Sequence, residues 1–96
     1  MSINFNEVKK ELLKNPEFKK EYEDLSSEYR IARMLIMTRL KSGLTQQEVA
    51  ERMGTSQSAV ARMESGKLGN LKTIEKYAEA TGNRITFQIQ RVASNK

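Results

Sequence analysis

The stretch TQQEVAERMGTSQSAVARMESGK, from Thr45 to Lys67, holds two short helical patterns that are broken at Gly54. Glycine readily takes the positive φ that a tight corner between helices requires, and Ala50, four residues earlier, is small enough for two helices to cross closely. Thr45 and Thr55 are candidate N-caps for the two helices, and a glutamate stands at the capping-box position after Thr45. The stretch therefore predicts a helix-turn-helix.

The second helix of this pair carries a polar outer face. If Val60 and Met63 face the core, Gln57, Ser58 and Arg62 face outward, because neighbours on a helix lie three or four residues apart. A glutamine amide can bond adenine in two places, and a guanidinium can do so with guanine. A generic helical corner with a solvated face is the alternative. The agreement of cap, glycine, apolar positions and polar face favours DNA binding.

The helix expected before this corner is apolar on more than one side. One stripe contains Tyr29, Ala32 and Ile36, and a second contains Leu35 and Leu40. A helix of this kind lies between two packed layers, so it is expected to be a wall shared by an N-terminal appendage and the domain that follows. The expected core consists of Val49, Ala50, Met53, Val60 and Met63, packed against Ile31, Leu35, Leu44, Leu71 and Ile74.

Apolar spacing predicts further elements on both sides. A helix is expected over 5–14, a second begins at Asn15 and Pro16, and another begins near Asn70. Residues 84–90, RITFQIQ, alternate as in a half-buried strand, which needs a partner strand for its backbone groups. A short tail packed on its own helices is the alternative. The predicted fold is mainly all-α, with an N-terminal helical extension (1–28), a helix-turn-helix domain (29–82) and a C-terminal β-strand and tail (83–96).

Composition narrows the possible functions. The 96 residues carry a formal net charge of +5, with no cysteine and no histidine. The commonest general base and the usual thiolate and imidazole metal ligands are therefore missing, and no enzyme, cofactor or metal site is expected. The first residues lack the apolar run of a signal peptide, and no window suits a membrane span, so a cytoplasmic protein without a membrane partner is expected. Basic character suits a polyanionic partner.

The quoted stretch resembles the core of the Cro/C1-type (Xre family) helix-turn-helix, with its TQ opening, glycine corner and E-x-G-K ending. The resemblance covers about residues 31–81 and implies a five-helix domain. It also implies that Arg39 pairs with Glu64 inside the fold, that Gln46 and Lys67 hold phosphates, and that residues of the second helix approach bases. The predicted DNA-binding residues are Gln46, Thr55, Ser56, Gln57, Ser58, Arg62, Lys67 and Asn70.

The extensions on both sides of this domain are similar to those of HigA-type antitoxins. That resemblance implies an autoregulatory homodimer that binds operator DNA and neutralises a HigB-like, RelE-family mRNA endonuclease toxin. Residues 18–25 are expected to fold back on the domain rather than bind a partner. A stand-alone Xre-family repressor is the alternative function, and a purely protein-binding module is a third. The candidate toxin-binding residues are Phe5, Val8, Leu12 and Leu13, and the candidate dimerisation residues are Ile85, Phe87 and Ile89.

Overall fold

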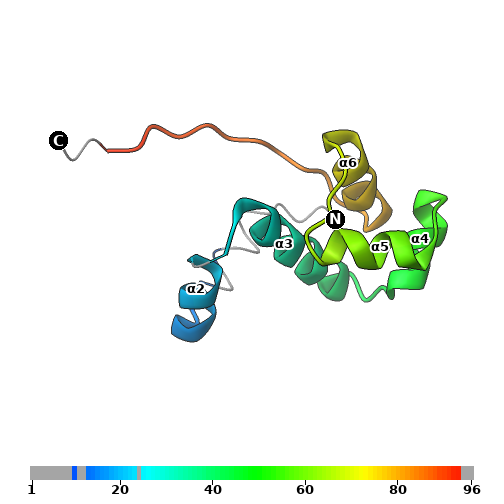
Figure 1. Cartoon of the computed structure of the whole chain (residues 1–96), viewed down its shortest axis with the longest axis horizontal. Coiled ribbons are helices and arrows are strands. Elements are labelled where there is room, and N and C mark those ends of the chain that lie inside the picture. The colour runs from blue at the N-terminus through cyan, green and yellow to red at the C-terminus, as the bar shows by residue number, and fades with distance from the viewer. Residues whose placement is uncertain (1–9, 11–12, 24, 94–96) are drawn as a thin grey trace.

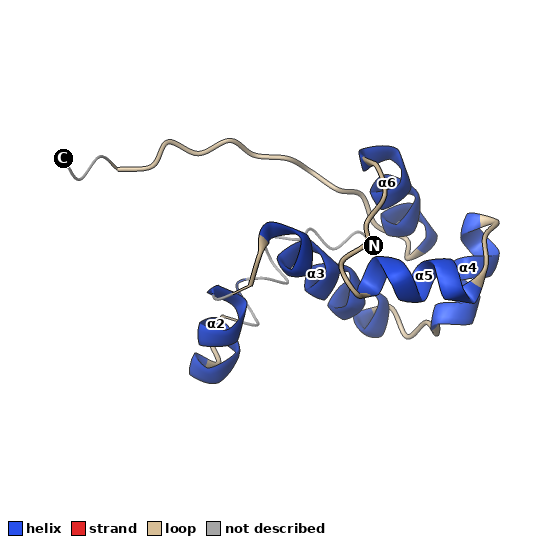
Figure 2. Ribbon diagram, viewed as in Figure 1, coloured by secondary structure: helices blue, strands red, loops and turns tan. Residues whose placement is uncertain are grey.

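The computed structural model describes residue 10 and residues 13–23 and 25–93. Four helices pack as one body, and a fifth lies beside the N-terminal part of that body (Figures 1 and 2). The predicted all-α architecture is confirmed; of the five described helices, one precedes residue 29, one spans it and three lie wholly within 29–82. The described helices are α2 (Pro16–Glu23), α3 (Ser27–Lys41), α4 (Gln46–Met53), α5 (Gln57–Glu64) and α6 (Leu71–Ala80).

Helix α3 is the shared wall that its sequence predicts. Ala32 and Leu35 are buried in the main core with α4, α5 and α6. Met34 is buried on another side of α3, in a second cluster with Leu13 and Phe18. Because the two clusters lie on different sides of one helix, Leu13 and Phe18 of the N-terminal extension pack on the domain without entering its main core.

The main core differs from the expected one at its edges. Leu71 is 53% exposed, while Leu68, in the loop before α6, is buried and takes part in the core. Ile31 is 37% exposed because it falls at the edge of the packed face of α3. Tyr77, which is fully buried, is the largest core side chain. The buried core residues are Ala32, Leu35, Val49, Ala50, Val60, Met63, Leu68, Ile74, Tyr77 and Ala80, with Leu44, Met53 and Ile85 packed against them.

Side chains cap the helices of the domain, as the sequence predicts for most of them. Thr45 and Glu48 form the capping box of α4, and Asn70 caps α6. The cap expected at Thr55 is one residue later, at Ser56, whose side chain accepts from the amide of Ala59. Helix α5 begins at Gln57, so Ser56 occupies the N-cap position and Thr55 lies one residue before it.

Helix α2 is held to α3 by a polar corner as well as by the Met34 cluster. Arg30 donates from Nη2 to the carbonyl of Glu23 at 2.7 Å and from Nε to the carbonyl of Leu25 at 3.0 Å. The bond to Glu23 gives a partner to a carbonyl at the end of α2, which helix geometry leaves unpaired, and the bond to Leu25 is to the segment between α2 and α3. The expected folding back of this segment on the domain is confirmed for Phe18, which packs in one cluster with Met34 and Met37.

The predicted strand over 84–90 is not formed. Residues 83–93 make no strand pairing in the described chain, and they run away from the helices (Figure 2). Ile85 still packs against the core, but Phe87 is 65% exposed and Ile89 is 101% exposed. The physical reason is that a single strand has no ladder partner within one chain.

None of the helices in the described residues has the length and apolar character that crossing a membrane requires.

Candidate nucleic-acid interface

The corner between α4 and α5 is built by the residues that the sequence singles out. Gly54 adopts φ +73°, the left-handed conformation in which a side chain would be strained. The amide of Thr55 donates to the carbonyl of Ala50 at 2.9 Å, which closes the end of α4. Ala50 is fully buried between the two helices, as are Val49 and Val60. The corner thereby fixes the direction in which α5 leaves α4.

Helix α5 presents a polar face to solvent. Gln57, Ser58 and Arg62 are exposed, and Ala61 between them is half-buried. The Arg62 side chain makes no hydrogen bond or ion pair to another residue of the described chain, so its guanidinium is available to a ligand. Ser56 is also exposed, but its hydroxyl oxygen caps α5. The outer face of α5 therefore offers an amide and a guanidinium at one surface.

Gln46, at the start of α4, connects this face to the interior. Its side chain is half-buried, and its Nε2 donates to Oε1 of Glu64 at 3.0 Å. Its Oε1 accepts from Nε2 of Gln57 at 3.4 Å. Two residues predicted to meet different parts of DNA, one a phosphate and one a base, are thus in contact with each other.

The loop between α5 and α6 brings Lys67 to the surface beside the end of α5. Its amide donates to the carbonyl of Arg62 at 3.0 Å, and its side chain is exposed. Gly66 has φ +105°, and a Cβ there would lie 3.0 Å from Cε1 of Tyr29. The side-chain oxygen of Asn70 accepts from the amide and the hydroxyl of Thr73, both at 2.9 Å, and so caps α6.

Beneath this surface, the Glu64 carboxylate receives hydrogen bonds from three other helices. Arg39 donates from Nε at 2.7 Å and from Nη2 at 3.0 Å, and the Tyr77 hydroxyl donates at 2.6 Å. The predicted Arg39 and Glu64 pair is confirmed. Burial alone would raise the pKa of Glu64, but the hydrogen bonds from Arg39, Tyr77 and Gln46 outweigh it and hold the pKa below the ordinary value. Glu64 is therefore a carboxylate at neutral pH.

The partners of this carboxylate also have shifted pKa values. The hydrogen bond to Glu64 raises the pKa of Arg39. Burial, together with the hydrogen bond to Glu64, raises the pKa of Tyr77, so its hydroxyl remains a donor. The sequence analysis did not predict that Tyr77 and Gln46 would join the pair. The available signal was a tyrosine on the inward face of α6, since a buried tyrosine hydroxyl needs a partner.

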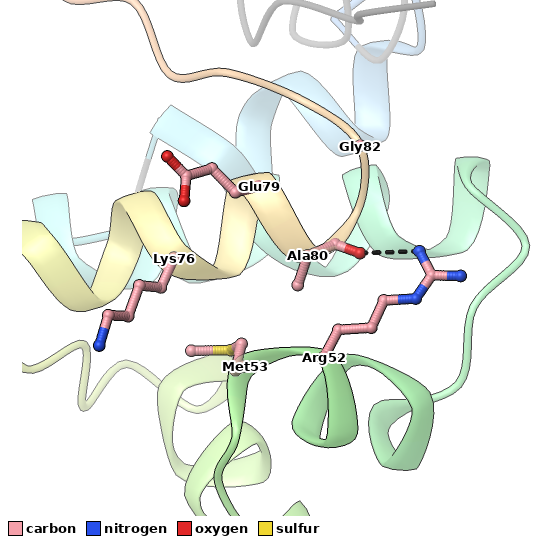
Figure 3. Close-up of a pocket in the computed structure, with 6 residues that line it drawn as sticks. All are labelled: Arg52, Met53, Lys76, Glu79, Ala80 and Gly82. Atoms are coloured by element: carbon pink, nitrogen blue, oxygen red, sulfur yellow. Dashed lines mark hydrogen bonds between the residues drawn. The ribbon is translucent and has the colours of Figure 1, made fainter.

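A separate cavity of about 420 Å³ opens between the C-terminal ends of α4 and α6 (Figure 3). Arg52 crosses it to donate to the carbonyl of Ala80 at 2.9 Å, which ties the two helices together. Lys76 and Glu79, on its lining, carry opposite charges. None of the predicted DNA-binding residues lines this cavity, so it is distinct from the polar face of α5.

Comparison with protein families agrees with this geometry. A family model described as Helix-turn-helix (HTH_3) matches residues 35–88, which is more than half of the chain. The chain belongs to the Cro/C1-type (Xre) helix-turn-helix family. Comparisons with curated proteins and with solved structures gave no match. The matched range of the helix-turn-helix family contains all of α4, α5 and α6 and begins within α3, so α2 lies outside it.

The predicted partner-binding residues fall partly outside the described structure. Phe5, Val8 and Leu12 lie outside the described residues. Leu13 is half-buried in the cluster with Phe18 and Met34, so its side chain already has neighbours.

Proposed function

We propose that this helix-turn-helix protein binds double-stranded DNA sequence-specifically, with α5 in the major groove, and regulates transcription. The observation that carries the proposal is the exposed surface of α5, where Gln57 in the first turn and Arg62 in the last turn are both exposed, with small residues between them, after a fixed helical corner. Small side chains at Ser58 and Ala61 permit close approach to base edges. Family membership supports DNA binding as the general activity.

Specific roles follow from the chemistry of each side chain. Gln57 offers a donor and an acceptor that fit adenine, and Arg62 offers two donors that fit guanine. Gln46 and Lys67, at either end of the helix pair, are placed to hold phosphates on both sides of the groove. Ser56, at the N-terminus of α5, adds a backbone amide that favours a phosphate, and the exposed hydroxyl of Thr55 beside it is a further candidate donor.

The spacing of two half-sites in an operator favours a dimeric protein. Two half-sites about 10 base pairs apart require two recognition helices at a fixed separation. The exposed apolar side chains of Phe87 and Ile89, on a segment with no strand partner in the described chain, suit pairing with the same segment of a second copy. Ile85 would anchor each strand to its own core.

A second candidate function, neutralising a HigB-like toxin as a HigA-type antitoxin, is favoured by one observation. The tail residues Phe87, Ile89 and Val92 are exposed beyond the helix-turn-helix domain, and an unpaired strand can add to the sheet of a partner. A stand-alone repressor would use the same tail for dimerisation alone. Co-purification with the product of the adjacent gene separates the two functions, because only the antitoxin forms a stable complex and suppresses toxicity.

DNA binding is tested by measuring affinity for a selected operator and for random DNA. Gln57→Ala or Arg62→Ala should weaken operator binding by about 1 to 3 kcal/mol with little loss on random DNA, whereas Lys67→Ala should weaken both and reduce the salt slope by about 1. Lys76→Ala, at the α4 and α6 cavity, is the control for a lost surface charge. Equal losses on both DNAs for Gln57→Ala and Arg62→Ala would contradict base reading.

A further inference from the structure

We propose that Glu64 sets the base preference of Gln57 through Gln46, so that α5 presents an edge that fits adenine better than guanine. Glu64 would then be a positioning residue in addition to a structural one. This inference rests on the proposed function, because it concerns how the same face of α5 reads DNA.

The first link in this chain of hydrogen bonds has only one possible direction. A carboxylate can accept hydrogen bonds but cannot donate them. The nitrogen of the Gln46 amide must therefore face Glu64, at 3.0 Å, because the reverse orientation would set two oxygens against each other. The orientation of an amide is commonly ambiguous, but here the charge of its neighbour decides it.

The second link transmits this direction to the recognition helix. With its nitrogen toward Glu64, Gln46 turns its oxygen toward Nε2 of Gln57, which donates to it at 3.4 Å. Gln57 has two N–H groups, and this bond uses one. The other N–H and the carbonyl oxygen are left to face a base.

The remaining edge of Gln57 discriminates between the purines. Adenine offers N7 as an acceptor and N6 as a donor in the major groove, which one N–H and one carbonyl satisfy. Guanine offers two acceptors, N7 and O6, and requires two donors. When one N–H of Gln57 donates to Gln46, the remaining N–H and carbonyl oxygen therefore fit adenine better than guanine.

Glu64→Gln should reverse the direction of the whole chain. Oε2 receives the two shortest hydrogen bonds, from Arg39 Nε at 2.7 Å and the Tyr77 hydroxyl at 2.6 Å, whereas Oε1 receives Arg39 Nη2 and Gln46 Nε2 at 3.0 Å each. We therefore expect the amide oxygen of the new side chain at the place of Oε2, with its two stronger donors. Its nitrogen then occupies the place of Oε1 and faces the side chain at position 46. Gln46 must then turn its oxygen toward position 64 and its nitrogen toward Gln57. The carbonyl oxygen of Gln57 accepts a hydrogen bond from that nitrogen. Both N–H groups of Gln57 become free, and guanine becomes acceptable.

Tyr77→Phe separates this effect from a merely structural one. It removes a hydrogen bond to Oε2 but leaves Oε1 and its bond from Gln46 in place. Both variants weaken the buried cluster, and only Glu64→Gln changes the direction of the amides. Gln46→Met is a second test that leaves the Arg39 and Glu64 pair intact and removes the link itself.

The experiment selects bound sequences from a pool of random duplexes, using the full-length chain and each variant at a temperature where it is folded. We expect the wild type to select an adenine that Gln57→Ala no longer selects. Glu64→Gln and Gln46→Met should lower the preference for adenine over guanine there by about tenfold, within the range for one bidentate contact, while Tyr77→Phe retains it.

The outcomes distinguish this inference from the function on which it rests. If the wild type selects no sequence, the proposed function itself is wrong. If it selects a sequence but Glu64→Gln and Gln46→Met keep the wild-type preference at the Gln57 position, Glu64 does not set it. An equal change in Tyr77→Phe would show that any weakening of the cluster suffices, which also overturns the positioning role.

Discussion

Arg39 and Glu64 lie 25 residues apart in the sequence and form a two-pronged pair in which Nε donates to Oε2 at 2.7 Å and Nη2 to Oε1 at 3.0 Å. The pair joins α3, which forms the wall of the domain, to the C-terminal end of α5, which carries the exposed polar face. Glu64 also accepts hydrogen bonds from Gln46 of α4 and from Tyr77 of α6. One carboxylate thus connects all four helices of the domain.

We expect removal of one member of the Arg39 and Glu64 pair to be strongly destabilising. Arg39→Met leaves the Glu64 carboxylate largely buried without its cation and should lower the free energy of unfolding by about 3 to 5 kcal/mol. The double variant Arg39→Met, Glu64→Leu removes both charges and should recover much of this loss. Urea unfolding followed by circular dichroism measures both. This account would be contradicted if the double variant lost as much free energy of unfolding as the two single variants lose in total.

Acid should destabilise the protein through Glu64. Its folded pKa is below the ordinary value of 4.5, so the unfolded state binds more protons as the pH falls. The stabilisation is complete above the ordinary value and is lost as the pH falls through the folded pKa. Thermal unfolding between about pH 5 and about pH 3 should therefore show a steeper loss in the wild type than in Glu64→Gln. If the unfolding temperatures of the wild type and Glu64→Gln fell in parallel with pH, the acid sensitivity would belong to other groups.

Gly66 should tolerate a side chain less well than another glycine of the same domain. Gly66→Ala adds backbone strain at φ +105° and brings a Cβ to 3.0 Å from Tyr29, whereas Gly43→Ala at φ +73° meets nothing within 4 Å. The strain alone costs about 1 to 2 kcal/mol, and we expect Gly66→Ala to cost more than Gly43→Ala. Tyr29→Ala should reduce the difference. An unchanged difference in that background would exclude the ring contact as its cause.

The local elements could be predicted from the sequence because their signals are local. The capping box at Thr45, the turn at Gly54 and the cap at Asn70 each depend on residues within one helical turn, and the structure contains all three. The polar outer face of α5 was predictable for the same reason, since the inward positions of α5 define the outward ones. The shared wall formed by α3 followed from its two apolar stripes.

What the sequence left undetermined depends on contacts between distant residues. The ring of Tyr29 meets Gly66, and Leu68 instead of Leu71 enters the core; neither follows from helical spacing. The strand predicted near Phe87 failed because alternation describes which side chains a partner could cover, while formation of a ladder requires the partner itself. The contact of Gln46 with Glu64 likewise needed the packed arrangement of α4 and α5.

Helix α2 should be separable from the helix-turn-helix domain. Phe18→Ala removes the aromatic side chain that packs on Met34, and it should release α2 while leaving the main core intact. We expect faster hydrogen exchange at the amide of Lys19, which donates to the carbonyl of Asn15, with little change in DNA affinity. Lys20→Ala, at an exposed position of the same helix, is the control. A loss of DNA affinity in Phe18→Ala alone would show that α2 supports the interface.

The tail should control dimerisation through one of its two faces. Phe87→Asp places a charge where we expect a second copy to pack, whereas Thr86→Asp places the same charge on the opposite side of an extended chain. Burying an unpaired carboxylate at a dimer contact is unfavourable, so Phe87→Asp should shift the protein toward monomers and weaken operator binding, and Thr86→Asp should do neither. Sedimentation at several concentrations measures the shift. A Phe87→Asp protein that remains as dimeric as Thr86→Asp would move the dimer contact away from the tail, and a wild-type protein that is monomeric throughout would exclude it.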